Sequence, residues 1–245
     1  MGKLFLMVGF VVVMFAFTAF ARENYETDSI KTSAGNLEIT FIGHGTLMFT
    51  FGGTVIHVDP WSRLTDYSKM PKADIILLTH HHRDHLDAVA VEKLLKEKTT
   101  LILTETSSEK IKGGLVMNNG DIKTEKGLKI EAVPAYNLVH MRSEGIPFHP
   151  KGVGNGYVIT FGNKRVYIAG DTENIPEMKS LEKINMAFLP MNLPYTMTPE
   201  MAASAAKMFK PIILYPYHYG ETDVSKLVNL LKEEKEIEIR IRKMK

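Results

Sequence analysis

The 245-residue sequence contains no cysteine. Disulfides, thiolate nucleophiles and sulfur ligands are therefore excluded, and any metal site has to use histidine, carboxylate or amide side chains. The chain also lacks an excess of either charge, because 30 Lys and Arg are interspersed with 28 Asp and Glu. A net charge of +2 without a basic stripe gives no reason to expect nucleic acid or an acidic membrane as a partner.

A long uncharged run lies at the N-terminus. Lys3 precedes the apolar stretch Leu4–Phe20, which closes on an A-x-A site at Ala21. These features are typical of a secretory signal peptide, and the stretch is short for a membrane span, which needs about 20 apolar residues. We therefore expect residues 1–21 to be a signal peptide and the mature protein to be periplasmic or extracellular, without stable membrane insertion. An uncleaved N-terminal anchor is the alternative.

The rest of the chain alternates strand-like and helix-like segments. Residues 22–36 are polar and are expected to form a loose lead-in to one domain, residues 37–245. Residues 113–127 predict a hairpin, whereas residues 138–154 show no periodicity, which is typical of a functional loop. Strands are expected at 37–42, 46–51, 54–58, 74–79, 101–104, 128–133, 156–161, 165–169, 186–190, 212–217 and 237–241, and helices at 88–97, 199–208 and 224–233.

Residues 80–85 read HHHRDH, which contains the pattern H-x-H-x-D-H. The apolar run before them predicts a buried strand that leads into a turn. Alternate residues of an extended chain point the same way, so His80 and His82 can hold one metal ion from one side. Asp84 and His85 follow at the turn, where they can reach a second ion. Imidazole and carboxylate ligands favour zinc, with iron and manganese as alternatives.

With four further motifs in order, the chain resembles metallo-β-lactamase superfamily hydrolases. It is most similar to the divergent branch that contains ascorbate-6-phosphate lactonase-like and N-acylphosphatidylethanolamine phospholipase D-like proteins. The resemblance implies an α/β fold, a four-layer αββα sandwich. The matching stretches are FIGHG at 41–45, VDPW at 58–61, THHHRDHL at 79–86, AGDT at 169–172 and PYHY at 216–219.

The resemblance also implies a ligand set for two metal ions. His80 and His82 match the first-metal pair, and Asp84 and His85 the second-metal pair. Asp171 matches the carboxylate that bridges the two ions, and His218 the last ligand of the second ion.

The chain departs from the family's pattern at the remaining ligand of the first ion. The family usually has a histidine where this sequence has Asn137. A neutral amide is a weaker zinc ligand than imidazole, so the first site could be weak or empty. His140 and His149 lie in the loop that follows, and either could substitute; the alternative is that both are solvent-exposed loop histidines.

Three further residues are expected near the site. Asp59 follows a strand and could accept a hydrogen bond from a ligand imidazole, which would fix the tautomer of that ring; the alternative is an ordinary turn aspartate before proline. His44 lies between two glycines and could line the pocket or serve only the turn. Tyr195 is a pocket candidate by its position between a strand and a helix.

The resemblance implies a hydrolase in which one or two metal ions activate water, while Asp84 orients that water or takes a proton. Zinc is the expected metal. The expected substrate is a small molecule with an ester, lactone, phosphodiester or amide bond, and no residue selects among these. Two alternatives stay open: a non-catalytic metal- or ligand-binding protein, which Asn137 favours, and an iron oxidoreductase, for which the chain lacks the expected partner domain.

Overall fold

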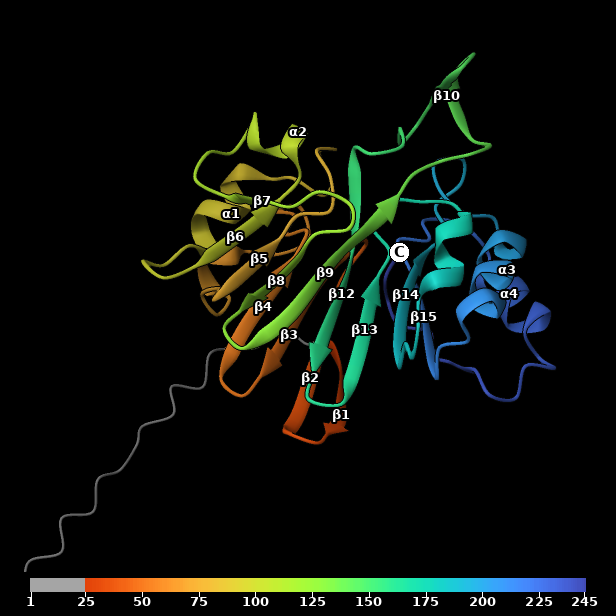
Figure 1. Ribbon diagram of the computed structural model, residues 1–245, viewed down its shortest axis with the longest axis horizontal. Coiled ribbons are helices and arrows are strands. Elements are labelled where there is room, and N and C mark those ends of the chain that lie inside the picture. Colours follow the sequence, from red (N-terminus) through yellow and green to blue (C-terminus); the bar gives the residue numbers. More distant parts are fainter. Residues whose placement is uncertain (1–24) are drawn as a thin grey trace, which may run out of the picture.

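The computed structural model describes residues 25–245, so the expected signal peptide lies outside the described residues. Two seven-stranded sheets face each other (Figure 1). The first sheet contains, in spatial order, β1 (Glu26–Thr32), β2 (Gly35–Gly43), β3 (Thr46–Phe51), β4 (Thr54–Val58), β5 (Ile75–Leu77), β6 (Thr100–Leu103) and β7 (Leu115–Val116). The second contains β16 (Glu238–Ile239), β15 (Ile213–Tyr217), β14 (Met186–Pro190), β13 (Lys164–Ile168), β12 (Gly154–Phe161), β9 (Leu128–Ala135) and β8 (Ile122–Glu125).

Helices cover the outer faces of both sheets, and a short hairpin projects from the body of the molecule (Figure 1). The helices α1 (Ala88–Leu94) and α2 (Glu105–Ser108) and the 3-10 helix η1 (Tyr67–Lys69) lie on the side of the first sheet, and α3 (Pro199–Phe209), α4 (Val224–Leu230) and the 3-10 helix η2 (Pro176–Ser180) on the side of the second. The hairpin consists of β10 (Met141–Ser143) and β11 (Ile146–Pro147). The order helix, sheet, sheet, helix confirms the predicted αββα sandwich.

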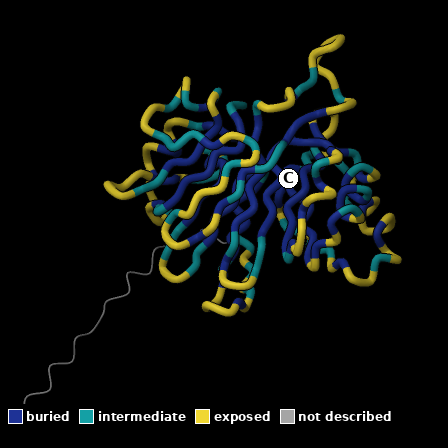
Figure 2. Tube along the Cα trace, viewed as in Figure 1, coloured by how far each residue is buried: buried dark blue, intermediate teal, exposed yellow. Residues whose placement is uncertain are grey.

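The apolar pattern of the strands explains these layers. In β5, Ile75 and Leu77 point into the core between the sheets, while Ile76 and the following residue, Leu78, pack under α1. A strand that is buried on both faces and paired in parallel has to be apolar throughout, and this is why the run before the histidines reads as continuous. Figure 2 shows the strands buried along both sheets, whereas the turns and the β10–β11 hairpin are exposed.

Side-chain caps begin the helices α1 and α3. The carboxylate of Asp87 accepts hydrogen bonds from the backbone N–H groups of Val89 and Ala90 at the start of α1. The hydroxyl of Thr198 accepts from the backbone N–H of Met201 at the start of α3, directly before Pro199. These contacts satisfy N–H groups that have no partner within the helix. None of the helices between residues 25 and 245 has the length and apolarity needed to cross a membrane.

Two expectations about segments were wrong. Residues 26–32 of the expected loose lead-in form β1, which pairs antiparallel with β2 along its whole length. The expected hairpin at 113–127 is instead a crossing between the sheets, because β7 pairs with β6 and β8 pairs with β9. The turn at Asn118 to Asp121 exists, but the strands on its two sides find their partners in different sheets.

Candidate metal centre

The predicted ligands lie where strands of both sheets end. Residues 80–85 follow β5 of the first sheet, Asp171 follows β13 and His218 follows β15 of the second sheet. His149 comes from the loop between β11 and β12. Since the strands are packed on both faces, their ends hold these side chains in place, which a metal site requires.

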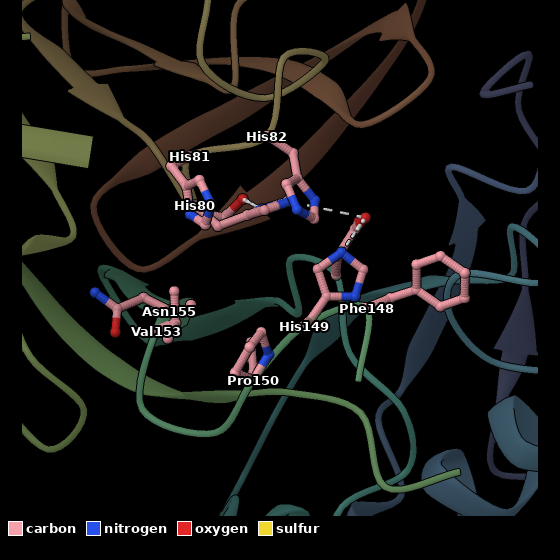
Figure 3. A pocket seen from close by; sticks show the side chains of 12 residues that line it. His80, His81, His82, Phe148, His149, Pro150, Val153 and Asn155 are labelled. Carbon is pink, nitrogen blue, oxygen red and sulfur yellow. Dashed lines mark hydrogen bonds and ion pairs between the residues drawn. The ribbon is translucent and has the colours of Figure 1, made fainter. Parts of the chain in front are cut away.

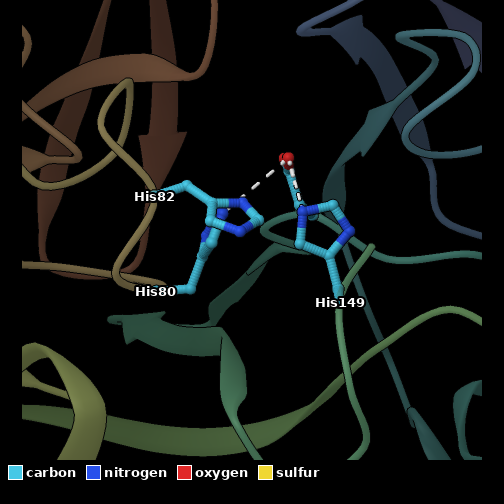
Figure 4. Close-up of side chains that lie close together, drawn as sticks. His80, His82 and His149 are labelled. Carbon is cyan, nitrogen blue, oxygen red and sulfur yellow. Dashed lines mark ion pairs between the residues drawn. The ribbon is translucent and has the colours of Figure 1, made fainter. Parts of the chain in front are cut away.

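A first cluster contains His80, His82, His149 and Asp171 (Figure 4). Each residue offers one ligand atom, and these atoms all lie within 4.8 Å of one another. Nε2 of His149 is 3.2 Å from Oδ2 of Asp171, and Nε2 of His80 is 3.9 Å from the same oxygen. Three imidazoles and one carboxylate at this spacing match the ligand number and chemistry of a zinc site.

A second cluster contains His85, Asp171 and His218, again with ligand atoms within 4.8 Å of one another. Oδ1 of Asp171 lies 3.4 Å from Nε2 of His85 and 3.4 Å from Nε2 of His218. Oδ2 of Asp84 lies 3.6 Å and 3.5 Å from the same two nitrogens. Asp171 thus turns one oxygen to each cluster, which is the arrangement expected of a bridging carboxylate.

The unsatisfied polar atoms of this region converge on the two clusters. The Nε2 atoms of His80, His85, His149 and His218 and Oδ1 of Asp171 are buried and make no hydrogen bond among the described residues. Buried polar atoms without partners are costly, so their concentration in one place needs an explanation. A metal ion that accepts their lone pairs supplies one, and the residues present therefore fit a metal centre.

The charges of the site also suit a cation. Burial, together with the neighbouring His85, holds the pKa of His80 well below its usual value, and burial with His149 lowers that of His82 to about 4. Both rings are therefore neutral, as metal ligands must be. Burial alone would raise the pKa of Asp171, but His218 and His85 hold it well below its usual value.

His85 shows the excess of negative charge most clearly. Burial lowers its pKa, but the carboxylates of Asp171, Asp59 and Asp84 outweigh burial and raise it to about 10. The carboxylates thus require a positive charge at this position, which is either a proton or a metal ion. Metal binding at His85 would release that proton.

Asp59 lies behind His85. Its Oδ2 accepts a hydrogen bond from Nδ1 of His85 at 2.8 Å, and Thr79 donates to both oxygens of Asp59 from its backbone N–H and its hydroxyl. With Nδ1 protonated, Nε2 of His85 presents its lone pair to the second cluster. Gly45 provides the space for this ring, because a Cβ at that position would lie 2.9 Å from Cε1 of His85.

Asn137 does not face the first cluster as a ligand would. Its Oδ1 accepts a 2.6 Å hydrogen bond from Nδ1 of His149, while its Nδ2 donates to the backbone oxygen of Tyr195 and to Glu173. The amide is therefore fully engaged, and its effect is to direct Nε2 of His149 at Asp171. Of the three candidates for this position, the structure brings His149 into the cluster and places Asn137 behind it.

His140, the third candidate, lies away from both clusters. Its Nδ1 is 2.7 Å from Oε1 of Glu173. Sequence reasoning missed this glutamate, which is completely buried and accepts hydrogen bonds from the backbone N–H groups of Leu138, Val139 and His140. Glu173 thus holds the beginning of the loop that carries His149. Only its place two residues after Asp171 could have suggested a role.

His44 and Asp84 form the edge of the second cluster. Nε2 of His44 lies 3.0 Å from Oδ2 of Asp84, and its ring centroid is 3.7 Å from that of His218. Asp84 keeps 31% of its side chain exposed, unlike Asp171 at 5%. The carboxylate of Asp84 is therefore in contact with both the cluster and the solvent. Burial would raise the pKa of Asp84, but the neighbouring imidazoles of His218 and His44 hold it well below its usual value.

The first cluster lies in a small cavity with an aromatic wall (Figure 3). Phe148, Pro150 and Val153 line this cavity together with His80, His82 and His149. Tyr195 does not line it, but its ring packs edge-on against Phe148 at 5.0 Å, and 44% of the residue is exposed. Tyr195 is thus placed at the rim.

Comparisons with known proteins agree with this geometry. A family model described as beta-lactamase superfamily domain matches residues 38–218. A UPF0173 metal-dependent hydrolase from Ligilactobacillus salivarius is 30% identical over 200 residues, which cover 75% of this chain and 85% of that protein. The solved structure of a protein from Parabacteroides distasonis, described as a metal-dependent hydrolase, shares 52% identity at a TM-score of 0.86, over 90% of this chain and 100% of its own. Igni18, a metallo hydrolase from Ignicoccus hospitalis, shares 27% identity at a TM-score of 0.70, over 85% and 95%.

Proposed function

Because this chain belongs to the beta-lactamase superfamily domain family, we propose that it is an exported zinc hydrolase that cleaves an ester, lactone, phosphodiester or amide bond of a small molecule. The relatives named above are described as metal-dependent hydrolases, and the proposal is built on this shared description. The observation that carries it is the convergence of buried, unpaired ring nitrogens on the two oxygens of Asp171.

Each residue has a distinct task in this proposal. One ion would be held by His80, His82 and His149, and the other by Asp84, His85 and His218. Asp171 would contact both ions. Bound zinc supplies Lewis acidity and brings the pKa of water toward about 7. Asp84 is the solvent-accessible carboxylate of the site, so it would orient the water or take its proton, while His44 holds the Asp84 side chain through their hydrogen bond.

The non-catalytic alternative rested on Asn137 at a ligand position. With His149 in the first cluster, both clusters offer at least three protein ligand atoms, and this argument loses its basis. The solvent-exposed part of Asp84 leaves an approach for water and substrate.

The proposal is tested by metal analysis joined to turnover. Protein reconstituted with zinc, manganese or iron would be assayed on lactone, phosphodiester and β-lactam panels, with and without chelator. We expect chelator-sensitive turnover on at least one panel, highest with zinc, and a loss of at least about a hundredfold in Asp84→Ala, because general acid–base catalysis contributes that much.

Glu92→Gln is the matched control, since Glu92 is an exposed carboxylate on the nearby α1. Turnover that survives the chelator, or that falls equally in both variants, would contradict the proposal. Bound metal without turnover on any panel would favour the binding protein instead. Export is tested separately by N-terminal sequencing of the secreted protein, where a start at Met1 contradicts cleavage after Ala21.

A further inference from the structure

The arginines of the described chain fall into two groups. Three arginines form ion pairs: Arg165 pairs with Glu131, Arg240 pairs with Asp28 and Glu238, and Arg242 pairs with Asp28. Arg63, Arg83 and Arg142 form none with any residue between 25 and 245. A guanidinium is always charged, and without a carboxylate it is free to bind an anion from outside the protein.

Of the three unpaired arginines, Arg142 lies against the metal centre. It belongs to β10 of the projecting hairpin, and its Nη2 lies 3.2 Å from Nε2 of His82. Its guanidinium carbon is 6.0 Å from the centre of the Phe148 ring, which forms the wall of the cavity (Figure 3). Arg63 differs, because it lies over Trp61 in a separate surface hollow that Arg83 also lines.

The contact with His82 leaves Arg142 available to a substrate. A neutral imidazole has one nitrogen with a free lone pair and one N–H, so a metal ion on either nitrogen of His82 leaves Nε2 unable to accept a hydrogen bond from Arg142. The hairpin does not depend on this contact, since β10 and β11 pair through their own backbones. A metal-loaded site would therefore leave the guanidinium at the mouth of the cavity without its present acceptor.

We propose that Arg142 binds an anionic group of the substrate, a phosphoryl or carboxylate group, beside the first cluster. The inference rests on the proposed hydrolase function and narrows its substrate class to anions. The planar guanidinium presents paired donors that match the oxygens of either group.

The test compares binding and turnover in three proteins. Zinc-loaded wild type, Arg142→Gln and Arg142→Lys would be titrated with inorganic phosphate and with acetate by calorimetry. They would then be assayed on bis(p-nitrophenyl) phosphate, which is anionic, and on p-nitrophenyl acetate, which is neutral. In Arg142→Gln we expect binding of the preferred anion to weaken about tenfold or more and KM for the anionic substrate to rise similarly, because a hydrogen bond to a charged group is lost. The neutral ester should be unaffected, and Arg142→Lys should recover part of the loss.

Arg165→Gln is the control, since it removes the same charge outside the site and leaves Lys129 beside Glu131. Unchanged binding of both anions in Arg142→Gln overturns the inference, as does an equal loss in Arg165→Gln. A lower zinc content in Arg142→Gln also overturns it, because Arg142 would then act through His82. Absence of chelator-sensitive turnover in the wild type would count against the proposed function alone, because the titrations still decide whether Arg142 binds the anion.

Discussion

Where the resemblance implies a single histidine ligand, this chain places two residues, Asn137 and His149. The amide at the position of the usual histidine does not reach the cluster; it orients the imidazole that does. The sequence contained both residues, yet their relation depends on how an aperiodic loop folds back on itself. Glu173 determines that path by binding three consecutive backbone N–H groups of the loop.

At the residue scale, we predict that His149→Ala lowers zinc content by one ion's share. His149 contributes one of the four ligand atoms of the first cluster, and its removal leaves the second cluster complete. His140→Ala is the matched control, because His140 lies in the same loop but pairs with Glu173. Stoichiometry measured by mass spectrometry of the purified variants checks this. Zinc loss in His140→Ala without loss in His149→Ala would reverse the assignment.

At the element scale, β1 is tied to the C-terminal segment. Asp28 in β1 accepts hydrogen bonds from Tyr215 and from both Arg240 and Arg242, across the edges of the two sheets. Met244 follows and is buried in the core between the sheets. Residues 26–32 are polar enough to suggest a loose segment, because one face of this edge strand is exposed to solvent. Tyr215, which donates a hydrogen bond to Asp28 on the other face, lies 187 residues further along the chain.

These contacts predict a pH-dependent contribution to stability. Burial disfavours the charged form of Asp28, but the hydrogen bonds from Tyr215, Arg242 and Arg240 outweigh it and lower its pKa. A lowered pKa means that the stabilisation is present above the unfolded-state value of about 3.9 and is lost as the pH falls through the folded-state value. Asp28→Asn should therefore lower the free energy of unfolding by about 2 kcal/mol at pH 7, between the ranges of exposed and buried ion pairs, and by less at pH 3.

Urea denaturation of both proteins at pH 7, 4 and 3 measures this difference. Glu236→Gln serves as the control, because it removes an exposed carboxylate near the same segment. A difference between wild type and Asp28→Asn that stays constant over this pH range would mean that the carboxylate charge contributes nothing.

At the scale of the whole molecule, the candidate metal centre lies between the two sheets. Residues 80–85 extend from the first sheet, while His149, Asp171 and His218 extend from the second. A bound ion therefore adds links between the layers, in addition to the apolar core. Without an ion, several buried ring nitrogens and Oδ1 of Asp171 have no hydrogen-bond partner within the described part of the chain, which is costly.

We accordingly predict that zinc raises the melting temperature. At a free zinc concentration about 100 times the Kd, the folded state gains about 2.7 kcal/mol, which for a chain of this size corresponds to about 5–10 °C. Thermal unfolding with zinc, with magnesium and with chelator checks this. Magnesium is the control, because it prefers oxygen ligands and should shift the transition little. Equal shifts with both ions would contradict a histidine-rich site.

The sequence by itself determined most of the strands and helices and the histidine cluster at 80–85, and its resemblance to a known family implied the sandwich and the ligands Asp171 and His218. Continuous apolar strands and the H-x-H-x-D-H spacing are local patterns, and local patterns can be read from the order of residues. Tertiary structure decided which loop histidine joins the first cluster, what Asn137 and Glu173 do, that residues 26–32 form a strand and that residues 113–127 cross between the sheets. These depend on contacts between segments far apart in the chain, where the free energy comes from the partner and not from the segment itself.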